Sequence, residues 1–379
     1  MDKISALISS HVVFTPDGKD VHGPTHNLSS YFDKKKIGHL LIRHSLHGGR
    51  RSEVEEHRQG RVCASYQAGL FPKLPFFLRL FQESAITLWY LKRTQADLFV
   101  GVDPLNGVLG VIGRKLGWVK RTIFFAVDYS PQRFNNPLLN YAYHAIGRFG
   151  ALNSDQVWNI SRRIMAVREK QGVPDDKNFF IPNSPDFREV KRWPFEKINK
   201  HDVVIVGNII KTLDYETAVA GVETLAKKWS DIRLLIIGMG KYLESLQELV
   251  KKRNLAQHVL FLGHKEHKEL IEILSRSAVG IALYSGEYSW NYYGDSMKAR
   301  EYLAAGLPVI ISDVPSTAYD IEDAKAGFII KSNPEELADA IDRLFSDQKL
   351  YLQMRNNAIK LARDFSFSKI ASKLLEKLL

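Results

Sequence analysis

Two ionisable residues in the segment Tyr292–Asp313 have types and spacing that suit a phosphorylated ligand. Lys298 and Glu301 lie three positions apart, so on a helix they project from the same side. A lysine in a first helical turn, beside free amides and the positive end of the dipole, suits a phosphate. The Glu301 carboxylate suits hydroxyl donors instead, such as a ribose 2′,3′-diol. A capped surface helix with a weak Lys298–Glu301 salt bridge has the same pattern.

The residues around this pair predict where its helix begins and ends. Gly294 opens a loop, and Asp295 and Ser296 are good N-cap residues. Strong helix formers follow over 297–305, and Gly306 ends the helix. A buried, β-branched strand is expected at 309–311. The segment therefore predicts a loop, a helix and a strand in that order.

Glycines and polar residues follow several expected strands of the second half. Ligands of open α/β sheets bind at the carboxyl ends of the strands, where glycine allows close approach of a backbone. Strand-end turns also use glycine without any ligand. The residues predicted to bind a ligand at this edge are Gly207, Asn208, Lys211, Gly238, Gly263, Tyr284, Asp295, Ser296, Lys298 and Glu301.

In the first half, Asp128 is the candidate for acid–base chemistry. A strand of apolar and hydroxyl residues over 122–127 delivers it to the carboxyl edge of a sheet. A carboxylate there could accept the proton of an attacking hydroxyl. The alternative is a structural role in the turn at Ser130 and Pro131. Asp103, Arg133 and Gly23 are predicted to lie on the same side as Asp128, where the attacking hydroxyl would bind. Gly23 also suits a plain loop.

The elements that must position these residues form two series in which strands alternate with helices. The first expects strands at 4–8, 38–43, 61–66, 98–102, 121–127, 156–161 and 178–181. The second begins near residue 203, after a Pro-rich and charged segment, 182–200. Such alternation indicates parallel sheets, so the predicted fold is α/β with two Rossmann-like domains. The expected domains are 1–185, 186–363 and a C-terminal helix over 364–379.

The composition is that of a globular protein with an uneven charge. Of a net charge of +11, residues 1–190 carry +9 (26 Lys and Arg against 17 Asp and Glu). Aromatic and basic side chains interleave over 71–93, which suits a membrane interface or a helix packed on a sheet. The excess charge suits an anionic membrane, an anionic acceptor, nucleic acid or simple solubility. A single cysteine, Cys63, and the lack of a secretory or membrane-spanning pattern predict a cytoplasmic protein.

Several motifs together resemble the GT-B glycosyltransferases, of the group 1 or family 4 type. They are IVGNI, LLIIGMG, FLGHKEHKELIEIL and KAREYLAAGLPVIISD in the second half, and FFAVDYSPQRFNN, SDQVWNISRR and IPNSPDF in the first. The resemblance implies two domains facing a central cleft, the first binding the acceptor and the second a nucleotide-sugar. It also implies that Glu301 holds the ribose, that Lys298 holds the diphosphate, and that the C-terminal helix crosses back onto the first domain.

The sequence departs from that family at three positions. Many retaining relatives have a second glutamate where this chain has Tyr293, so retention and inversion of the sugar both remain open. Relatives often have an arginine and a lysine where this chain has Asn208 and Asp214. Lys211 is the expected substitute for those cations. Without an Asp-x-Asp motif, catalysis is expected to use Lys298 and helix amides rather than a metal ion.

The predicted activity is sugar transfer, of a hexosyltransferase-like kind, from a nucleotide-sugar to an acceptor hydroxyl on a lipid-linked or cell-surface glycan. The nucleotide-sugar is a substrate, so no cofactor is expected. The protein would be cytoplasmic or peripheral on the inner face of the membrane. The alternatives are a UDP-sugar 2-epimerase-like enzyme and a non-catalytic basic binder of nucleic acid or membrane. No nucleic-acid motif was found, so no nucleic acid is expected.

Overall fold

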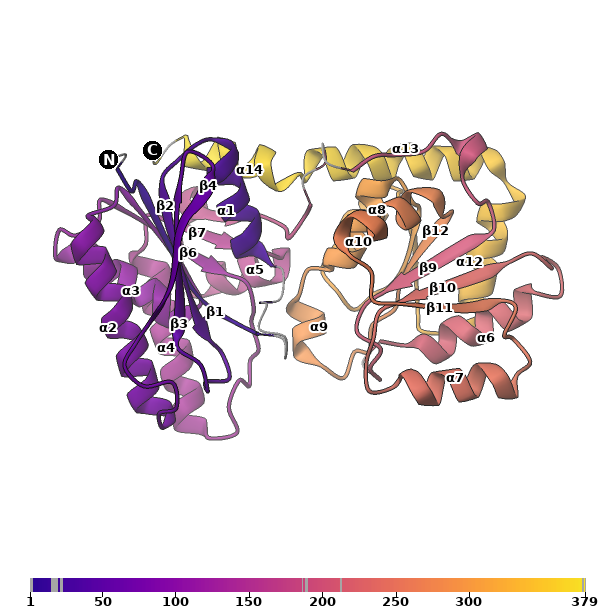
Figure 1. Cartoon of the computed structure of the whole chain (residues 1–379). Helices are drawn as coiled ribbons and strands as arrows, with labels where there is room; N and C mark the ends of the chain where they lie inside the picture. The colour runs from indigo at the N-terminus through magenta and orange to yellow at the C-terminus, as the bar shows by residue number, and fades with distance from the viewer. Residues whose placement is uncertain are drawn as a thin grey trace. The chain divides into compact units, whose positions relative to one another are not determined.

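The computed structural model describes residues 3–14, 20, 23–185, 187, 190–211, 213–376 and 378. The chain divides into two compact units. Unit 1 comprises Met1–Pro182 with Ser368–Leu379, and unit 2 comprises Asn183–Phe367. Each unit contains its own sheet with helices packed on it (Figure 1). No helix of the described part of the chain is long and apolar enough to cross a bilayer.

The sheet of unit 1 has eight strands in the order β4-β3-β2-β1-β5-β6-β7-β8. These are β1 (Ala6–Val12), β2 (His39–Ser45), β3 (Ser52–Arg58), β4 (Arg61–Ala68), β5 (Leu98–Val102), β6 (Arg121–Ala126), β7 (Gln156–Asn159) and β8 (Asn178–Phe180). Pairing is parallel from β2 through β1 to β8. After the neighbouring strands β1 and β5, the chain continues in opposite directions along the sheet. The carboxyl ends of these two strands are therefore the topological switch point.

The strands β3 and β4 correct the prediction of a purely parallel sheet. Both pair antiparallel, β3 with β2 and β4 with β3. The segment 52–58 was not among the expected strands, although its alternating pattern is typical of a half-buried strand. In the structure Ser52, Val54 and His57 are buried while residues between them are only partly covered. The two strands form a hairpin that extends one edge of the sheet.

The helices of unit 1 are α1 (Pro24–Lys34), α2 (Phe76–Thr94), α3 (Pro104–Lys115), α4 (Pro137–Asn153), α5 (Arg162–Lys170) and α14 (Phe367–Leu375, which begins one residue before the unit boundary). Helices α2, α3 and α4 form one layer, with α3 in the middle and packed on β5 and β6. Helix α1 packs on β1 and β2 from the other face (Figure 1). A bond from the Gln156 side-chain amide to the Leu374 carbonyl, 3.1 Å, joins β7 to α14.

Unit 2 has six parallel strands in the order β11-β10-β9-β12-β13-β14. They are β9 (Asp202–Val206), β10 (Arg233–Ile237), β11 (Val259–Gly263), β12 (Val279–Ala282), β13 (Val309–Ser312) and β14 (Gly327–Ile330). Numbered along the chain, this is the 3-2-1-4-5-6 order of a Rossmann fold, with its switch point between β9 and β12. The prediction of a Rossmann-like second half is confirmed.

The helices of unit 2 are α6 (Tyr215–Leu225), α7 (Leu243–Lys252), α8 (His267–Arg276), α9 (Ser289–Tyr293), α10 (Met297–Ala305), α11 (Thr317–Asp323), α12 (Pro334–Ser346) and α13 (Gln348–Asp364). Alternate strand residues build a core on each face of the sheet. Val203 and Ile205 pack in one cluster, and Val204 packs in the other. The strands are apolar on both faces because helices cover both.

Candidate active site

The beginning of helix α10 is held in place by side-chain hydrogen bonds. Ser296 caps the helix, since its hydroxyl accepts a bond from the Ala299 amide at 3.1 Å. The same hydroxyl lies 2.6 Å from the hydroxyl of Tyr284, and the Ser296 amide donates to Thr317. The predicted helix 297–305 and its Ser296 cap are therefore confirmed. The Ser296 side chain is buried, and its hydroxyl is used to cap the helix.

Asp295 is not placed as expected for a residue that contacts a donor. Its side chain is fully buried and accepts bonds from Arg300 (2.7 Å), Thr317 (2.7 Å) and the Asn183 amide (3.1 Å). Arg300 is buried too and also bonds Asp320 at 2.5 Å. These partners occupy the carboxylate, so the geometry gives no support to the predicted donor contact of Asp295. Its position fits an anchor for the loop before α10.

The ammonium group of Lys298 lies at the switch point of unit 2. A Cβ placed on Gly207, just after β9, would come within 2.5 Å of both Cε and Nζ of Lys298. Nζ also lies 5.5 Å from the ring centroid of Tyr284, which follows β12. Burial lowers the pKa of Lys298 to about 8, although the charge of Glu301 opposes this shift. The predicted lysine is thus at the edge where such sheets bind ligands.

Glu301 is buried one helical turn after Lys298. Its side chain accepts no hydrogen bond from any residue that the structure describes, and its only ion-pair neighbour there is His267, at 4.0 Å. Burial raises the pKa of the carboxyl to about 7, and Lys298 offsets part of that rise. The Glu301 side chain is 9% exposed, so its oxygens remain accessible to a ligand that supplies hydroxyl protons.

The loops after β9, β10 and β11 are joined by backbone bonds at the same edge. The Gly207 amide donates to Ile237, and the Gly238 amide donates to Gly263, each at 2.9 Å. Gly238 has φ +143°, and a Cβ there would meet the Gly207 carbonyl at 1.9 Å. These bonds bring the predicted glycines 207, 238 and 263 into one row, and at Gly238 a side chain would separate the first two loops.

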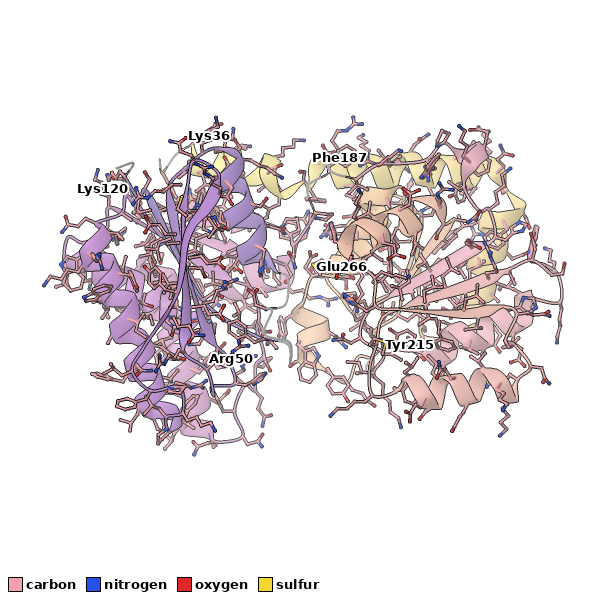
Figure 2. All side chains as sticks on the ribbon, viewed as in Figure 1. Lys36, Arg50, Lys120, Phe187, Tyr215 and Glu266 are labelled. Carbon is pink, nitrogen blue, oxygen red and sulfur yellow. The ribbon has the colours of Figure 1, made fainter. Side chains whose placement is uncertain are left out.

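Asn208 and Lys211 lie on the loop that follows Gly207, and both are exposed. The hydroxyl of Tyr215 (labelled in Figure 2) supports this loop by donating to the carbonyl of Asn208 at 3.2 Å. Lys211 lines an open groove of about 670 Å³ together with Tyr284. Tyr284 therefore borders both the Lys298 site and the groove that carries Lys211.

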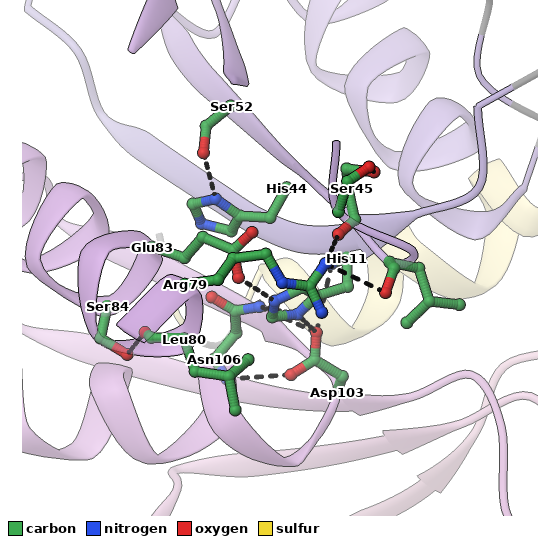
Figure 3. Close-up of polar contacts among 12 residues, drawn as sticks. His11, His44, Ser45, Ser52, Arg79, Leu80, Glu83, Ser84, Asp103 and Asn106 are labelled. Atoms are coloured by element: carbon green, nitrogen blue, oxygen red, sulfur yellow. Dashed lines mark hydrogen bonds and ion pairs between the residues drawn. The ribbon is translucent and has the colours of Figure 1, made fainter. Parts of the chain in front are cut away.

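Unit 1 has a second cluster of ionisable side chains at its own switch point (Figure 3). His11, near the end of β1, bonds Asp103 after β5 through Nδ1 at 2.7 Å. Its Nε2 contacts Glu83 of α2 at 3.1 Å. The amide of Asn106 and its side chain both donate to Asp103. The predicted residue Asp103 is thus part of a three-element cluster.

The cluster holds a buried positive charge and a strained backbone. Burial would lower the pKa of His11, but Asp103 and Glu83 raise it to about 10. Asp103 has φ +87° and ψ 164°, a conformation that costs free energy for any residue except glycine. Such strain concentrates at functional sites. Behind His11, His44 is bonded to Ser52 and Thr87, and burial lowers its pKa to about 3.

Asp128 and Arg133 form an ion pair just after β6. The Asp128 side chain is 40% exposed and makes no turn-capping bond among the described residues, so the capping alternative finds no support. Burial would lower the pKa of Arg133, but Asp128 raises it, with a contribution from Asp103. The charge of Asp103, in the His11 cluster, therefore also acts on the Asp128–Arg133 pair. Gly23 is the N-cap of α1, and its amide donates to the His26 side chain at 3.1 Å.

The sequence prediction missed His11 and Glu83. The first strand was expected to end at residue 8, which left His11 outside it, and Glu83 was read as part of an aromatic and basic helix. The available signal was the polar run of residues 9–11 at the end of an apolar strand. Only the strand order places that run beside Asp103.

Comparison with known proteins agrees with this architecture. Residues 187–361 match the family model of glycosyl transferases group 1. A D-inositol 3-phosphate glycosyltransferase of Corynebacterium urealyticum is 29% identical over 161 residues, covering 40% of this chain and 37% of that protein. The match thus spans less than half of the relative's length.

Two solved structures are similar over 99% of both chains. Sucrose-phosphate synthase from Thermosynechococcus elongatus has a TM-score of 0.73 at 17% identity. HepE of Anabaena, in complex with UDP and glucose, has a TM-score of 0.70 at 15% identity. The chain therefore has the GT-B fold, and its residues 187–361 are similar to the glycosyl transferases group 1 family.

Proposed function

We propose that the protein transfers a sugar from a nucleoside-diphosphate sugar to an acceptor hydroxyl. The observation that carries this proposal is the pair Lys298 and Glu301 at the switch point of a Rossmann-type sheet. Neither side chain has a hydrogen-bond partner in the described part of the chain, and burial shifts the pKa of each toward neutrality. A ligand with a phosphate and vicinal hydroxyls would supply hydrogen-bond partners to both side chains.

In this proposal the diphosphate lies at the start of α10. The amides of Met297 and Lys298 begin that helix and have no acceptor among the described residues, which suits an anion. The Lys298 ammonium adds a full charge beside them, and Glu301 accepts the ribose hydroxyl protons. Lys211, from the groove beside Tyr284, is a second cation for the phosphates.

We further propose that the leaving group is stabilised without a metal ion or cofactor. Charge grows on the nucleoside diphosphate as the glycosidic bond breaks, and a fixed cation with oriented amides stabilises that charge. Lys298 and α10 supply both. Treatment with EDTA should then leave transfer unchanged, whereas a metal-dependent reaction would stop and recover on addition of Mg²⁺.

On the acceptor side, we propose Asp128 as the proton acceptor of an inverting reaction, or as the group that orients the acceptor if the reaction is retaining. Its carboxylate is half-exposed after β6 and is held by Arg133. Asp103 is presented nearby by the His11 and Asn106 bonds. The acceptor we propose is a lipid-linked or cell-surface glycan, and the excess positive charge of the first half supports a position on an anionic membrane.

A thermal-shift panel of UDP-, GDP-, ADP-, CMP- and dTDP-sugars tests the donor. A bound donor at 100 times its dissociation constant would add about 2.7 kcal/mol to the unfolding free energy. Glu301→Ala should remove the shift for the responding nucleotide. Glu223→Gln in α6, which removes an exposed ion pair with Arg253, should retain it. If no nucleotide-sugar shifts the wild type, or if Glu301→Ala responds normally, the donor assignment is wrong.

A further inference from the structure

The first part of helix α2, up to Thr87, buries polar side chains and exposes apolar ones, whereas its last turns bury Tyr90 and Leu91 in the core. It buries Arg79, Glu83 and Thr87, which bond the strand ends of unit 1. It exposes Phe77, 67%, and Phe81, 75%, to solvent. Surface helices of soluble proteins normally bury the apolar stripe and expose the polar one. The apolar side chains exposed on α2 therefore indicate that this face binds a partner.

The same property continues over the two neighbouring helices of the layer. Leu116, 54% exposed, lies just after α3, and Leu138 and Tyr141 of α4 are 80% and 76% exposed. Helix α3 packs against both α2 and α4, so these side chains belong to one layer (Figure 1). We call the exposed apolar side chains of α2, α3 and α4 the outer helix face. Large exposed apolar side chains that gather on neighbouring elements are typical of an interaction surface.

The exposed charged side chains of this helix layer are all basic. Helices α2, α3 and α4 contain a single carboxylate, Glu83, and that residue is buried against His11. Their exposed cations lie beside aromatic rings: Arg93 is 5.0 Å from the Trp89 centroid, and Lys115 is 5.6 Å from the Phe149 centroid. Neither cation has an acidic partner among the described residues. An apolar face with a cationic margin and no exposed acid complements an anionic lipid surface.

We propose that the outer helix face docks on an anionic phospholipid membrane, with Phe77, Phe81, Trp89, Leu138 and Tyr141 inserted at the interface. Aromatic rings sit favourably at headgroup depth, and the cations attract anionic headgroups. The stripe from Phe77 to Trp89 covers about 18 Å along α2 at 1.5 Å per residue. This proposal extends the expected membrane segment 71–93 to three helices, and it does not depend on the transfer reaction.

The test is co-sedimentation of the full chain with vesicles of phosphatidylcholine alone or with about one-third phosphatidylglycerol, at low and high salt. We expect binding to the anionic vesicles that weakens with salt, because exposed charges are screened. The triple variant Phe81→Ser, Trp89→Ser, Tyr141→Ser should partition roughly tenfold less or worse, since each aromatic side chain contributes to insertion. All three side chains are at least half exposed, so folding should persist.

The matched control is Tyr319→Ser in α11, whose side chain is 50% exposed, as is that of Trp89. This variant should bind vesicles like the wild type. Sedimentation velocity without lipid addresses the competing occupant, a second copy of the chain. Self-association that the triple variant abolishes, without vesicle binding at low salt, would overturn the proposal in favour of a dimer interface. Equal vesicle binding by the wild type and the triple variant would also overturn it.

Discussion

Lys298 and Glu301 are residues whose charge state depends on what surrounds them. Burial lowers the pKa of the lysine to about 8 and raises that of the carboxyl to about 7. A phosphate beside the ammonium would favour its charged form, and hydroxyl donors would favour the carboxylate. In the proposed site, ligand binding and the protonation of these two groups would therefore depend on each other.

From these two values we expect nucleoside-diphosphate affinity to be greatest between about pH 7 and pH 8. Above about pH 8 Lys298 loses its proton and with it the attraction to phosphate. Below about pH 7 Glu301 becomes protonated and no longer accepts two hydroxyl bonds. Titration calorimetry across this range measures the profile.

The variant Lys298→Arg separates the two limbs of that profile. Arginine keeps its charge at all accessible pH values, so the alkaline decline should disappear while the acidic one stays. Lys298→Ala should lower turnover more than affinity, because leaving-group charge grows in the transition state. A wild-type affinity that is flat from about pH 6 to pH 9 would show that neither group contacts the nucleotide.

For Asp128, the change to asparagine keeps the size of the side chain and removes its capacity to accept a proton. If Asp128 is the base, turnover should fall about 10²-fold or more, with donor affinity intact. The melting temperature should change little, because exposed ion pairs contribute about 0–1 kcal/mol. Asp231→Asn, an exposed partner of His201 in unit 2, is the control and should transfer sugar normally. Normal turnover in Asp128→Asn would leave this carboxylate as a structural partner of Arg133.

At the scale of elements, the position of α10 depends on a buried ion network rather than on the helix itself. Arg300 links Asp295 before the helix to Asp320 in α11. Thr317 bonds both Asp295 and the Ser296 amide. The first turn, which presents Lys298, is therefore fixed to the following helix.

We expect Asp295→Asn to lower the unfolding free energy by about 3 kcal/mol, because Arg300 loses one of two buried counter-charges. Donor affinity should also fall, since the start of α10 would be less well held. Chemical denaturation measures the first effect and calorimetry the second. Glu223→Gln, which removes an exposed partner of Arg253, should cost no more than about 1 kcal/mol. An Asp295→Asn variant as stable as this control would contradict the anchoring role.

At the scale of the molecule, each unit has its own sheet and its own core clusters. Separate cores can unfold in separate transitions. If the donor site lies wholly in unit 2, a bound nucleoside diphosphate should raise only one transition in differential scanning calorimetry. At 100 times the dissociation constant the shift should be about 5–11 °C for a unit of this size. A single transition, or equal shifts of two, would contradict independent unfolding.

Much of unit 2 was determined by local sequence. Helix α10 begins and ends at the predicted residues because Ser296 caps it and Gly306, at φ +83°, ends it. The strand expected at 309–311 is also present and is one residue longer. Capping, periodicity and β-branched runs act over a few residues, so they can be read without knowing the fold. Helix α13 was not predicted, although its pattern was available over 348–364.

The tertiary structure decided features that depend on strand order. Nothing local indicates that His11 and Asp103, 92 residues apart, meet beside Glu83. The local pattern also does not show that the Asp295 carboxylate is paired with Arg300. It does not show that β3 and β4 run antiparallel. The outer helix face is likewise assembled from three separate helices. Contacts between distant segments are set by how strands pair and how helices cover them, and a single sequence records that only indirectly.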